Sequence, residues 1–324
     1  MIDIGDSARR QYINALSIFT ALEEARKKAT QYRGGMYWKT HGKTKIDYLI
    51  RTQTDNSQKC IGPRSSETEA IYGKFISSKN VIESRIHDLL KELELHRRLN
   101  RALLVGRAPQ MLVDILNMFS RAGISEHFRV IGTHAVYAYE TAAGVRIEKE
   151  AALETNDVDL LWVIDKKLKF QARMKYNESS MIALLKKVDS TFEMRGEQRY
   201  TAVNSKGFEV DIIHREISNE GTKGTSNSSR MTTDEDDFIA VNASSAGRLQ
   251  GAPPFTSVIV SPTGYMARIN TVSPLEFIKV KIKLSMQPDR DPIKKSRDQL
   301  QANIIEKLVN EYLPQLLIKK VSKK

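Results

Sequence analysis

The sequence predicts an α+β protein in which a mixed sheet is flanked by helical N-terminal and C-terminal regions. Apolar residues recur at helical spacing in the first third of the chain and again after residue 273. Between these regions, short apolar runs typical of strands alternate with helical segments. We therefore expect a mainly helical N-terminal region (1–103), a core (104–217), a mobile loop (218–237) and C-terminal strands and helices (238–324).

Composition narrows the class of protein. The chain has 324 residues, 40% of them apolar, which is enough for two or three compact units. No apolar run approaches the roughly 20 residues that span a bilayer, and no secretory leader is evident, so we expect a cytoplasmic protein. Cys60 is the single cysteine, which excludes an internal disulfide. The net charge of +12 favours a phosphate-rich partner.

The N-terminal region contains two predicted helices and a looser, basic stretch over residues 32–54. Between residues 26 and 51 there are eight Lys or Arg against one acid, with four aromatic residues interleaved. Cations and stacking rings are what an RNA or single-strand groove needs. A solvated helix end with core aromatics is the alternative interpretation. The candidate acceptor-binding residues are Arg33, Tyr37, Trp38, Lys39 and Arg64.

The remaining elements follow from periodicity and from turn residues. Apolar residues at helical spacing predict a long helix over 78–101, and Pro109 and Gly123 are placed to begin and end a shorter one. Pro274 and Pro292 open the two C-terminal helices. The predicted strands cover residues 128–131, 158–164, 191–194, 200–203, 208–214, 238–241, 257–260 and 265–269, with a further helix over 181–188.

The most informative segment places Asp157 and Asp159 at the start of a predicted strand. Strand side chains alternate, so both carboxylates point to one face. Two such carboxylates repel each other unless a cation lies between them, and Mg²⁺ or Mn²⁺ takes oxygen ligands of this kind. A polar turn before a strand is the alternative for this pair.

A third carboxylate lies downstream, at Asp211 in the apolar stretch 208–213. If the two strands pair, Asp211 reaches the same face, and three carboxylates can hold two metal ions about 4 Å apart. Glu209 shares the face of Asp211 and is a competing ligand. Asp211 could also be a buried, hydrogen-bonded acid.

Upstream, Gly132 and Thr133 follow one strand and precede a helix. A glycine there lets the backbone approach closely, and the free N–H groups of a helix start suit a triphosphate. Thr133 adds a hydroxyl, although threonine is also an ordinary N-cap. His134 could touch phosphate or simply lie exposed at the helix start.

The order of strand, Gly-Thr, helix, Asp-x-Asp strand and single-Asp strand resembles the nucleotidyltransferase superfamily, with its polymerase β-like fold. The segments 132–145 (GTHAVYAYETAAGV) and 154–162 (ETNDVDLLW) are similar to a bacterial branch of it. Segments 32–39 and 62–65 and the helix at Pro274 extend the similarity over most of the chain. The chain departs from the pattern in having Thr133, where Ser or Gly is usual, and an insertion over residues 144–154.

The resemblance implies an enzyme that moves a nucleotide from a nucleoside triphosphate to an acceptor with Mg²⁺ or Mn²⁺, releasing pyrophosphate. It implies metal binding by the three aspartates and a role for Lys279 or Lys281 in neutralising the triphosphate. RNA, such as a tRNA end, is the favoured acceptor, and a toxin that blocks an RNA end is compatible with it. A protein or small-molecule hydroxyl, and a non-catalytic nucleic-acid-binding protein with a degenerate core, are the alternatives.

Overall fold

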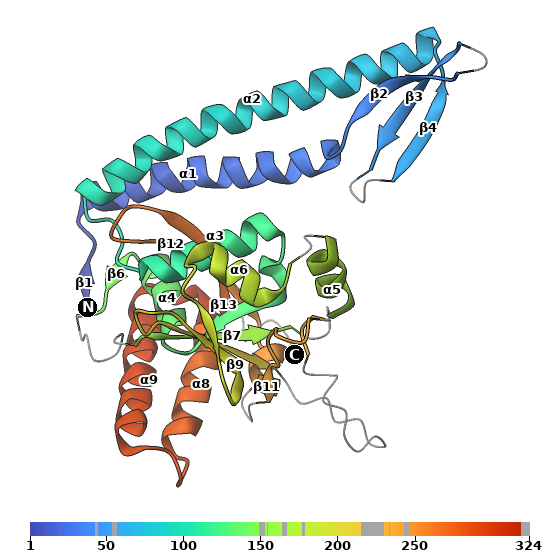
Figure 1. Ribbon diagram of the computed structural model, residues 1–324. Coiled ribbons are helices and arrows are strands. Elements are labelled where there is room, and N and C mark those ends of the chain that lie inside the picture. Colours follow the sequence, from blue (N-terminus) through green and yellow to red (C-terminus); the bar gives the residue numbers. More distant parts are fainter. Residues whose placement is uncertain are drawn as a thin grey trace. The chain divides into compact units, whose positions relative to one another are not determined.

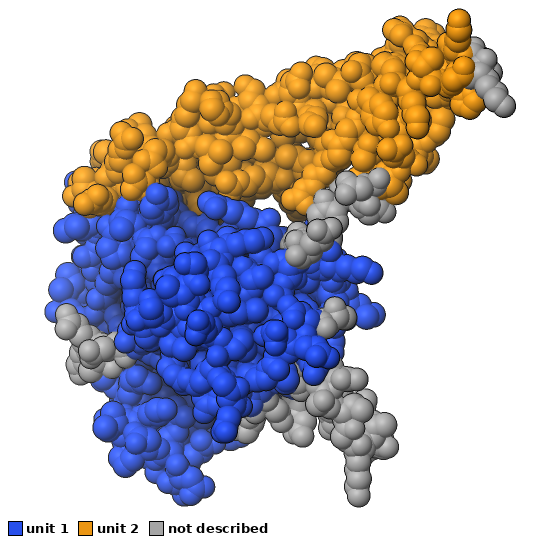
Figure 2. Space-filling model, in the orientation of Figure 1, with its two compact units in different colours: residues 1–9, 104–324 blue, residues 10–103 orange. Residues whose placement is uncertain are grey.

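The computed structural model describes residues 1–42, 45–53, 57–148, 153, 155–163, 167–176, 179–214, 230–232, 234–242 and 246–318 (Figure 1). The chain divides into two compact units (Figure 2). Residues 10–103 form what we call the N-terminal unit, and residues 1–9 with 104–324 form the main unit. Within the described residues, no helix has both the length and the apolar character needed to cross a bilayer.

Two long helices form the body of the N-terminal unit: α1 (Asp6–Ala29) and α2 (Ser66–Ala102). Polar contacts join the two helices. In one of them, the Gln11 side-chain amide donates a hydrogen bond of 3.0 Å to Asn100 Oδ1. Helix α2 begins well before the predicted start at residue 78 because Ser65 caps it. The Ser65 hydroxyl accepts from the Thr68 N–H, and the Thr68 hydroxyl accepts from the Ser65 N–H.

The looser stretch expected over residues 32–54 is instead largely a sheet. Strands β2 (Met36–Thr40), β3 (Asp47–Thr52) and β4 (Gln58–Pro63) pair antiparallel in that order. The strands are short and carry many charged and polar residues, which obscures their alternation in the sequence. The N-terminal unit is therefore not purely helical.

A mixed sheet forms the centre of the main unit, as predicted. The strand order is β5-β7-β10-β9-β8, and β11 also pairs with β10. Strands β7 and β10 are parallel, whereas β5 is antiparallel to β7 and β9 is antiparallel to β10. The strands are β5 (Phe128–Ile131), β7 (Asp157–Trp162), β8 (Glu193–Arg195), β9 (Gln198–Val203), β10 (Glu209–His214) and β11 (Val241–Asn242).

Helices and a second pair of strands complete the main unit (Figure 1). Helix α3 follows Pro109 and ends at Gly123, whose φ of +70° is the left-handed cap expected there. The strand pair β12 (Pro254–Val260) and β13 (Met266–Val272) leads to helix α8 (Pro274–Ser285). The other elements are β1 (Ile2–Asp3), α3 (Gln110–Ala122), α4 (Val136–Ala143), β6 (Val145–Arg146), α5 (Lys167–Tyr176), α6 (Met181–Val188), α7 (Ala246–Gly251), α9 (Pro292–Tyr312) and α10 (Gln315–Ile318).

The predicted loop over 218–237 is described only in part, since residues 215–229 and 233 lie outside the described residues. The basic tail 319–324 also lies outside them. Asp237, the last residue of the predicted mobile loop, is buried. Its carboxylate accepts hydrogen bonds of 3.0 Å from the backbone N–H groups of Met181 and Ile182. It therefore caps the start of α6.

Candidate active site

Four acidic side chains lie on one face of the sheet, across the parallel pair β7 and β10. In the register of the two strands, Asp159 is the partner of Asp211 and Asp157 is the partner of Glu209. Alternation along each strand turns all four to the same face, and Val158 and Val210 between them are fully buried on the other. The pairing of strands thus brings the three predicted aspartates together.

The neighbours of these acids differ from one another. The Thr201 hydroxyl of β9 donates a hydrogen bond of 2.5 Å to Asp211 Oδ1. The second carboxylate oxygen of Asp211 takes no part in this hydrogen bond. Glu209 instead forms an ion pair with Arg195 of β8. The competing ligand already has a cationic partner, so the geometry favours Asp211 over Glu209 as the third carboxylate.

Asp159 lies at the centre of the group and is the most perturbed acid of the face. Burial and then the charges of Asp157 and Asp211 raise its pKa to about 7, although Lys281 and Arg297 partly oppose the rise. Burial also raises the pKa of Asp211 above its ordinary value. The face therefore holds more negative charge than its surroundings neutralise, which is the condition that a bound cation relieves.

Gly132 lies against the Asp159 carboxylate. Its φ is +65°, a conformation that side chains rarely adopt. A Cβ at this position would lie 3.2 Å from Asp159 Cγ and would overlap Oδ2. The glycine thus allows the turn after β5 to pass directly beside the Asp159 carboxylate, a contact that the sequence did not predict.

Thr133 and His134 point into the protein from the turn 132–135, a 3-10 helix that precedes α4. The Thr133 hydroxyl accepts from the Gln301 amide of α9 over 3.0 Å. His134, which the sequence left as a phosphate contact or an exposed residue, is buried beside the rings of Tyr137 and Phe208. Burial lowers the pKa of His134 to about 4, partly opposed by the Asp157 backbone.

Helices α8 and α9 supply the positive charge near Asp159. Lys281 is buried and forms an ion pair with Asp298 at a distance of 2.7 Å. Arg290 forms an ion pair with the other carboxylate oxygen of Asp298 at 2.8 Å. Both Lys281 and Arg297 act on the Asp159 charge. Lys279, the other predicted lysine, pairs with Glu276 of its own helix. Of the two lysines, only Lys281 is coupled to the carboxylate face.

Comparison with known proteins identifies the family of the chain. A family model described as nucleotidyltransferase matches residues 110–324, more than half of the chain. The chain belongs to the nucleotidyltransferase family. It is therefore an enzyme that uses a nucleoside triphosphate. No curated protein and no solved structure matches the chain.

Nucleotidyltransferases generally use a divalent metal ion, and the donor set of this site can be tested against one. Asp157, Asp159 and Asp211 offer the hard oxygen ligands that Mg²⁺ and Mn²⁺ prefer. In the described residues, no three acidic, histidine or cysteine side chains are placed so that they could hold a metal ion as they stand. Asp157 and Asp211 each accept a threonine hydroxyl instead. The chemistry of the donors, three carboxylates on one face of the sheet, fits a divalent metal ion.

The candidate acceptor residues lie in the N-terminal unit, and they fall into two groups. Arg64 lies over the ring of Trp38, 5.1 Å from its centroid, and forms ion pairs with Asp47 and Glu69. Arg64 and Trp38 therefore both make contacts within the N-terminal unit. The other three are exposed: Arg33, Tyr37 and Lys39.

Several residues around the carboxylates were not identified from the sequence: Thr201, Arg195, Arg297 and Gln301. Arg297 and Gln301 come from α9, more than 130 residues after the nearest aspartate of β7. A polar residue on an amphipathic helix gives no sign of which distant side chain it meets. The one available signal was the position of α9 directly after α8, which predicts an antiparallel neighbour.

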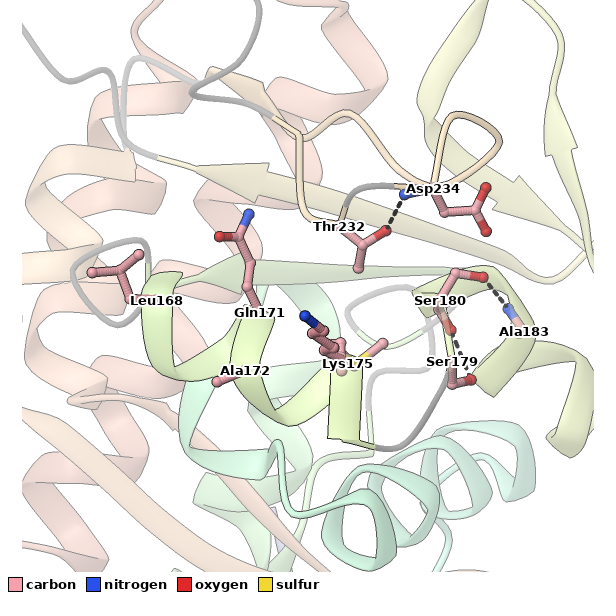
Figure 3. Close-up of a pocket in the computed structure, with 10 residues that line it drawn as sticks. Leu168, Gln171, Ala172, Lys175, Ser179, Ser180, Ala183, Thr232 and Asp234 are labelled. Atoms are coloured by element: carbon pink, nitrogen blue, oxygen red, sulfur yellow. Dashed lines mark hydrogen bonds between the residues drawn. The ribbon is translucent and has the colours of Figure 1, made fainter. Parts of the chain in front are cut away.

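A separate cavity of about 790 Å³ lies in the main unit between α5, the start of α6, Thr232 and Asp234 (Figure 3). Its wall mixes apolar side chains such as Leu168 and Ala172 with Lys175 and Asp234. None of the four acids on the sheet face lines it. The cavity is therefore distinct from the candidate active site.

Proposed function

We propose that the protein is a metal-dependent nucleotidyltransferase that moves a nucleoside monophosphate from a nucleoside triphosphate to a hydroxyl group of RNA. Asp157, Asp159 and Asp211 carry the reaction, with Mg²⁺ or Mn²⁺ as the metal. The observation that supports this most strongly is the register of β7 and β10, which sets Asp159 beside Asp211. One face thereby offers three carboxylates with unbalanced charge.

In the reaction, the acceptor oxygen forms a bond to the α-phosphorus. The bond from that phosphorus to the oxygen bridging to the β-phosphate breaks, and pyrophosphate leaves with the electron pair. The acceptor proton passes to solvent. When bound, the divalent metal would supply a Lewis acid that stabilises the charge on the attacking and leaving oxygens.

The residues of the chain have separate roles in this scheme. Asp157 and Asp159 would hold the metal on the triphosphate side, and Asp211 would hold it on the acceptor side. The backbone N–H groups after Gly132 would bind the β- and γ-phosphates. Because the Thr133 hydroxyl is bonded to Gln301, its backbone N–H is the better candidate for a phosphate contact. Lys281 and Arg297 would offset the negative charge of the nucleotide.

The choice of RNA as acceptor is supported by where the charge lies. Residues 10–103 contain 18 Lys or Arg and 10 Asp or Glu, a net charge of +8 out of the +12 of the whole chain. A unit of about 90 residues with this surplus attracts polyanions through the release of their counterions. A protein or small-molecule acceptor gives no reason for such a concentration of positive charge.

The test is incubation of the purified protein with each α-labelled nucleoside triphosphate, with Mg²⁺ or Mn²⁺, and with total RNA and total protein together. We expect label on RNA, and none when Asp157→Ala and Asp159→Ala are combined. Label on protein would overturn the choice of acceptor. Transfer that persists in the double variant would overturn the assignment of the carboxylates.

A further inference from the structure

We propose that the face of the β2–β3–β4 sheet that is turned away from α2 is a stacking surface for a single-stranded segment of the RNA acceptor. We call this face the outer face and define it by Tyr37, Lys39, His41 and Tyr48. The inference rests on the proposed function, because it names the form of the RNA that the enzyme takes. Of the candidate acceptor residues in β2, it places Tyr37 and Lys39 on one face of the sheet and Trp38 on the other.

The opposite face of the sheet, the inner face, packs against α2. The rings of Trp38 and Tyr72 lie 5.8 Å apart, centroid to centroid. The Arg51 guanidinium lies 4.1 Å from the centroid of the Phe75 ring. A Cβ on Gly62 would be 3.5 Å from the Thr68 side chain. Groups on the inner face are thus used to hold the sheet on the helix, and they are poor candidates for ligand contacts.

Alternation turns the remaining aromatic residues away from α2. Side chains alternate along β2, so those of Tyr37 and Lys39 point to the face opposite that of Trp38. His41, directly after the strand, continues the alternation on the side of Tyr37 and Lys39. Lys39 is the direct cross-strand partner of Tyr48. The His41 and Tyr48 rings lie 6.4 Å apart in an edge-on arrangement. The register therefore sets Tyr37, His41 and Tyr48 on the same face of the sheet as Lys39.

Exposure and charge indicate what this face can bind. Tyr37 keeps 37% of its surface exposed, and Lys39 and His41 are exposed as well, whereas Tyr48 is half-buried and Ile50, the cross-strand partner of Tyr37, is buried. Within the described residues Lys39 forms no ion pair, in contrast to Arg64, which has two. Exposed rings beside a cation suit bases that stack and a phosphate that passes close by.

The charge of the unit favours a nucleic acid over an apolar peptide. The surplus of +8 in residues 10–103 is complementary to a phosphate backbone. A duplex hides the faces of its bases in its own stack, whereas a single strand offers them to protein rings. Single-stranded RNA is therefore the occupant that uses both the rings and the charge.

The test measures RNA binding without nucleotide transfer. A fluorescently labelled single-stranded RNA of mixed sequence is titrated with full-length protein in the absence of nucleoside triphosphate, and anisotropy is recorded. We expect Tyr37→Ala combined with Tyr48→Ala to weaken binding by roughly 30-fold or more, since each stacked base contributes about 1–3 kcal/mol. Combining Tyr37→Phe with Tyr48→Phe keeps both rings and should restore most of the affinity.

Two controls separate this result from misfolding and from general charge attraction. Tyr265→Ala removes an exposed tyrosine of the main unit, which keeps 45% of its surface accessible, and should change the affinity less than twofold. An RNA duplex of the same length should bind at least about tenfold more weakly than the single strand. Equal binding of duplex and single strand, or an alanine pair that binds as the wild type does, would overturn the stacking surface.

The outcome can be told apart from failure of the proposed function. If the wild type labels RNA and the alanine pair binds and labels it equally well, the outer face is wrong and the carboxylate site stands. If the wild type binds single-stranded RNA through the outer face but labels only protein, the proposed acceptor is wrong and the binding surface stands.

Discussion

The Cα of Gly132 packs directly against the carboxylate of Asp159, with no room for a side chain between them. The glycine belongs to the turn after β5, and the aspartate belongs to the neighbouring strand β7. The contact fixes the distance between the backbone that would hold the phosphates and the acid that would hold the metal. Its loss is the most direct test of the geometry of the site.

We expect Gly132→Ala to lower nucleotide transfer at least about 100-fold, because a methyl group here displaces the Asp159 side chain. The positive φ adds about 1–2 kcal/mol of strain. The matched control is Gly144→Ala, since Gly144 has a φ of +67° and only Arg9 Nε, at 3.9 Å, near an added Cβ. It should show similar strain in urea unfolding and keep its activity. Equal activity losses in both variants would show that backbone strain, and not the Asp159 contact, is responsible.

The identity of the third carboxylate gives a second prediction. Asp211→Asn should reduce transfer about 1000-fold or more, because removal of one ligand removes much of the metal affinity on the acceptor side. Glu209→Gln, two residues away on the same face, should reduce transfer less than about tenfold, since Glu209 is paired with Arg195. Activity is measured at several Mg²⁺ concentrations. A larger loss in the Glu209 variant would exchange the roles of the two acids.

The sequence predicted the carboxylate face well, and the reason is local. Alternation in a strand turns Asp157 and Asp159 to one face whatever the rest of the fold does. The apolar residues around Asp211 marked a second buried strand, and the pairing of buried strands in one sheet needed only one further assumption. A close approach of the backbone at Gly132 could be expected because glycine has no Cβ, but the sequence did not show that Asp159 would be the group beside it.

Other features depend on contacts that a sequence does not display. The sheet at residues 36–63 was missed because its strands are short and largely polar on one side. The burial of His134 follows from the 3-10 turn, which rotates the side chain inward before α4 starts. The links of Gln301 to Thr133 and of Arg297 to Asp159 depend on how α9 packs on the core. Periodicity gives the buried face of such a helix but not the partner of each polar residue.

The two lysines of α8 should differ in their effect on nucleotide binding. Lys281→Gln removes one of the two cations that act on Asp159, and Asp298 keeps Arg290 as a partner at 2.8 Å. We expect the KM for the nucleoside triphosphate to rise by about 10- to 100-fold, as for the loss of a contact to a charged group. Lys279→Gln, which breaks only the pair with Glu276, should change KM less than about twofold. KM values that change equally would place neither lysine at the triphosphate.

His134 makes stability depend on pH in a direction that can be worked out. Its pKa is about 4 in the folded protein and 6.5 in the unfolded chain, so below pH 6.5 the unfolded state binds the extra proton. Stability is therefore lost as the pH falls from 6.5 towards 4. For this group alone the loss is about 2 kcal/mol at pH 5 relative to pH 7.5, and roughly 3 kcal/mol below pH 4.

The measurement is urea unfolding of the metal-free protein at pH 7.5 and pH 5, compared with His134→Gln, which cannot titrate. Other groups contribute equally to both proteins, so the difference between the two pH-dependent losses isolates the histidine. We expect the wild type to lose about 2 kcal/mol more than the variant over this range. Because the ring lies between Tyr137 and Phe208, protonation would place a charge among aromatic groups in the interior. Parallel losses in the two proteins would mean that His134 reaches solvent when protonated, and that the turn beside the Asp157 backbone opens in acid.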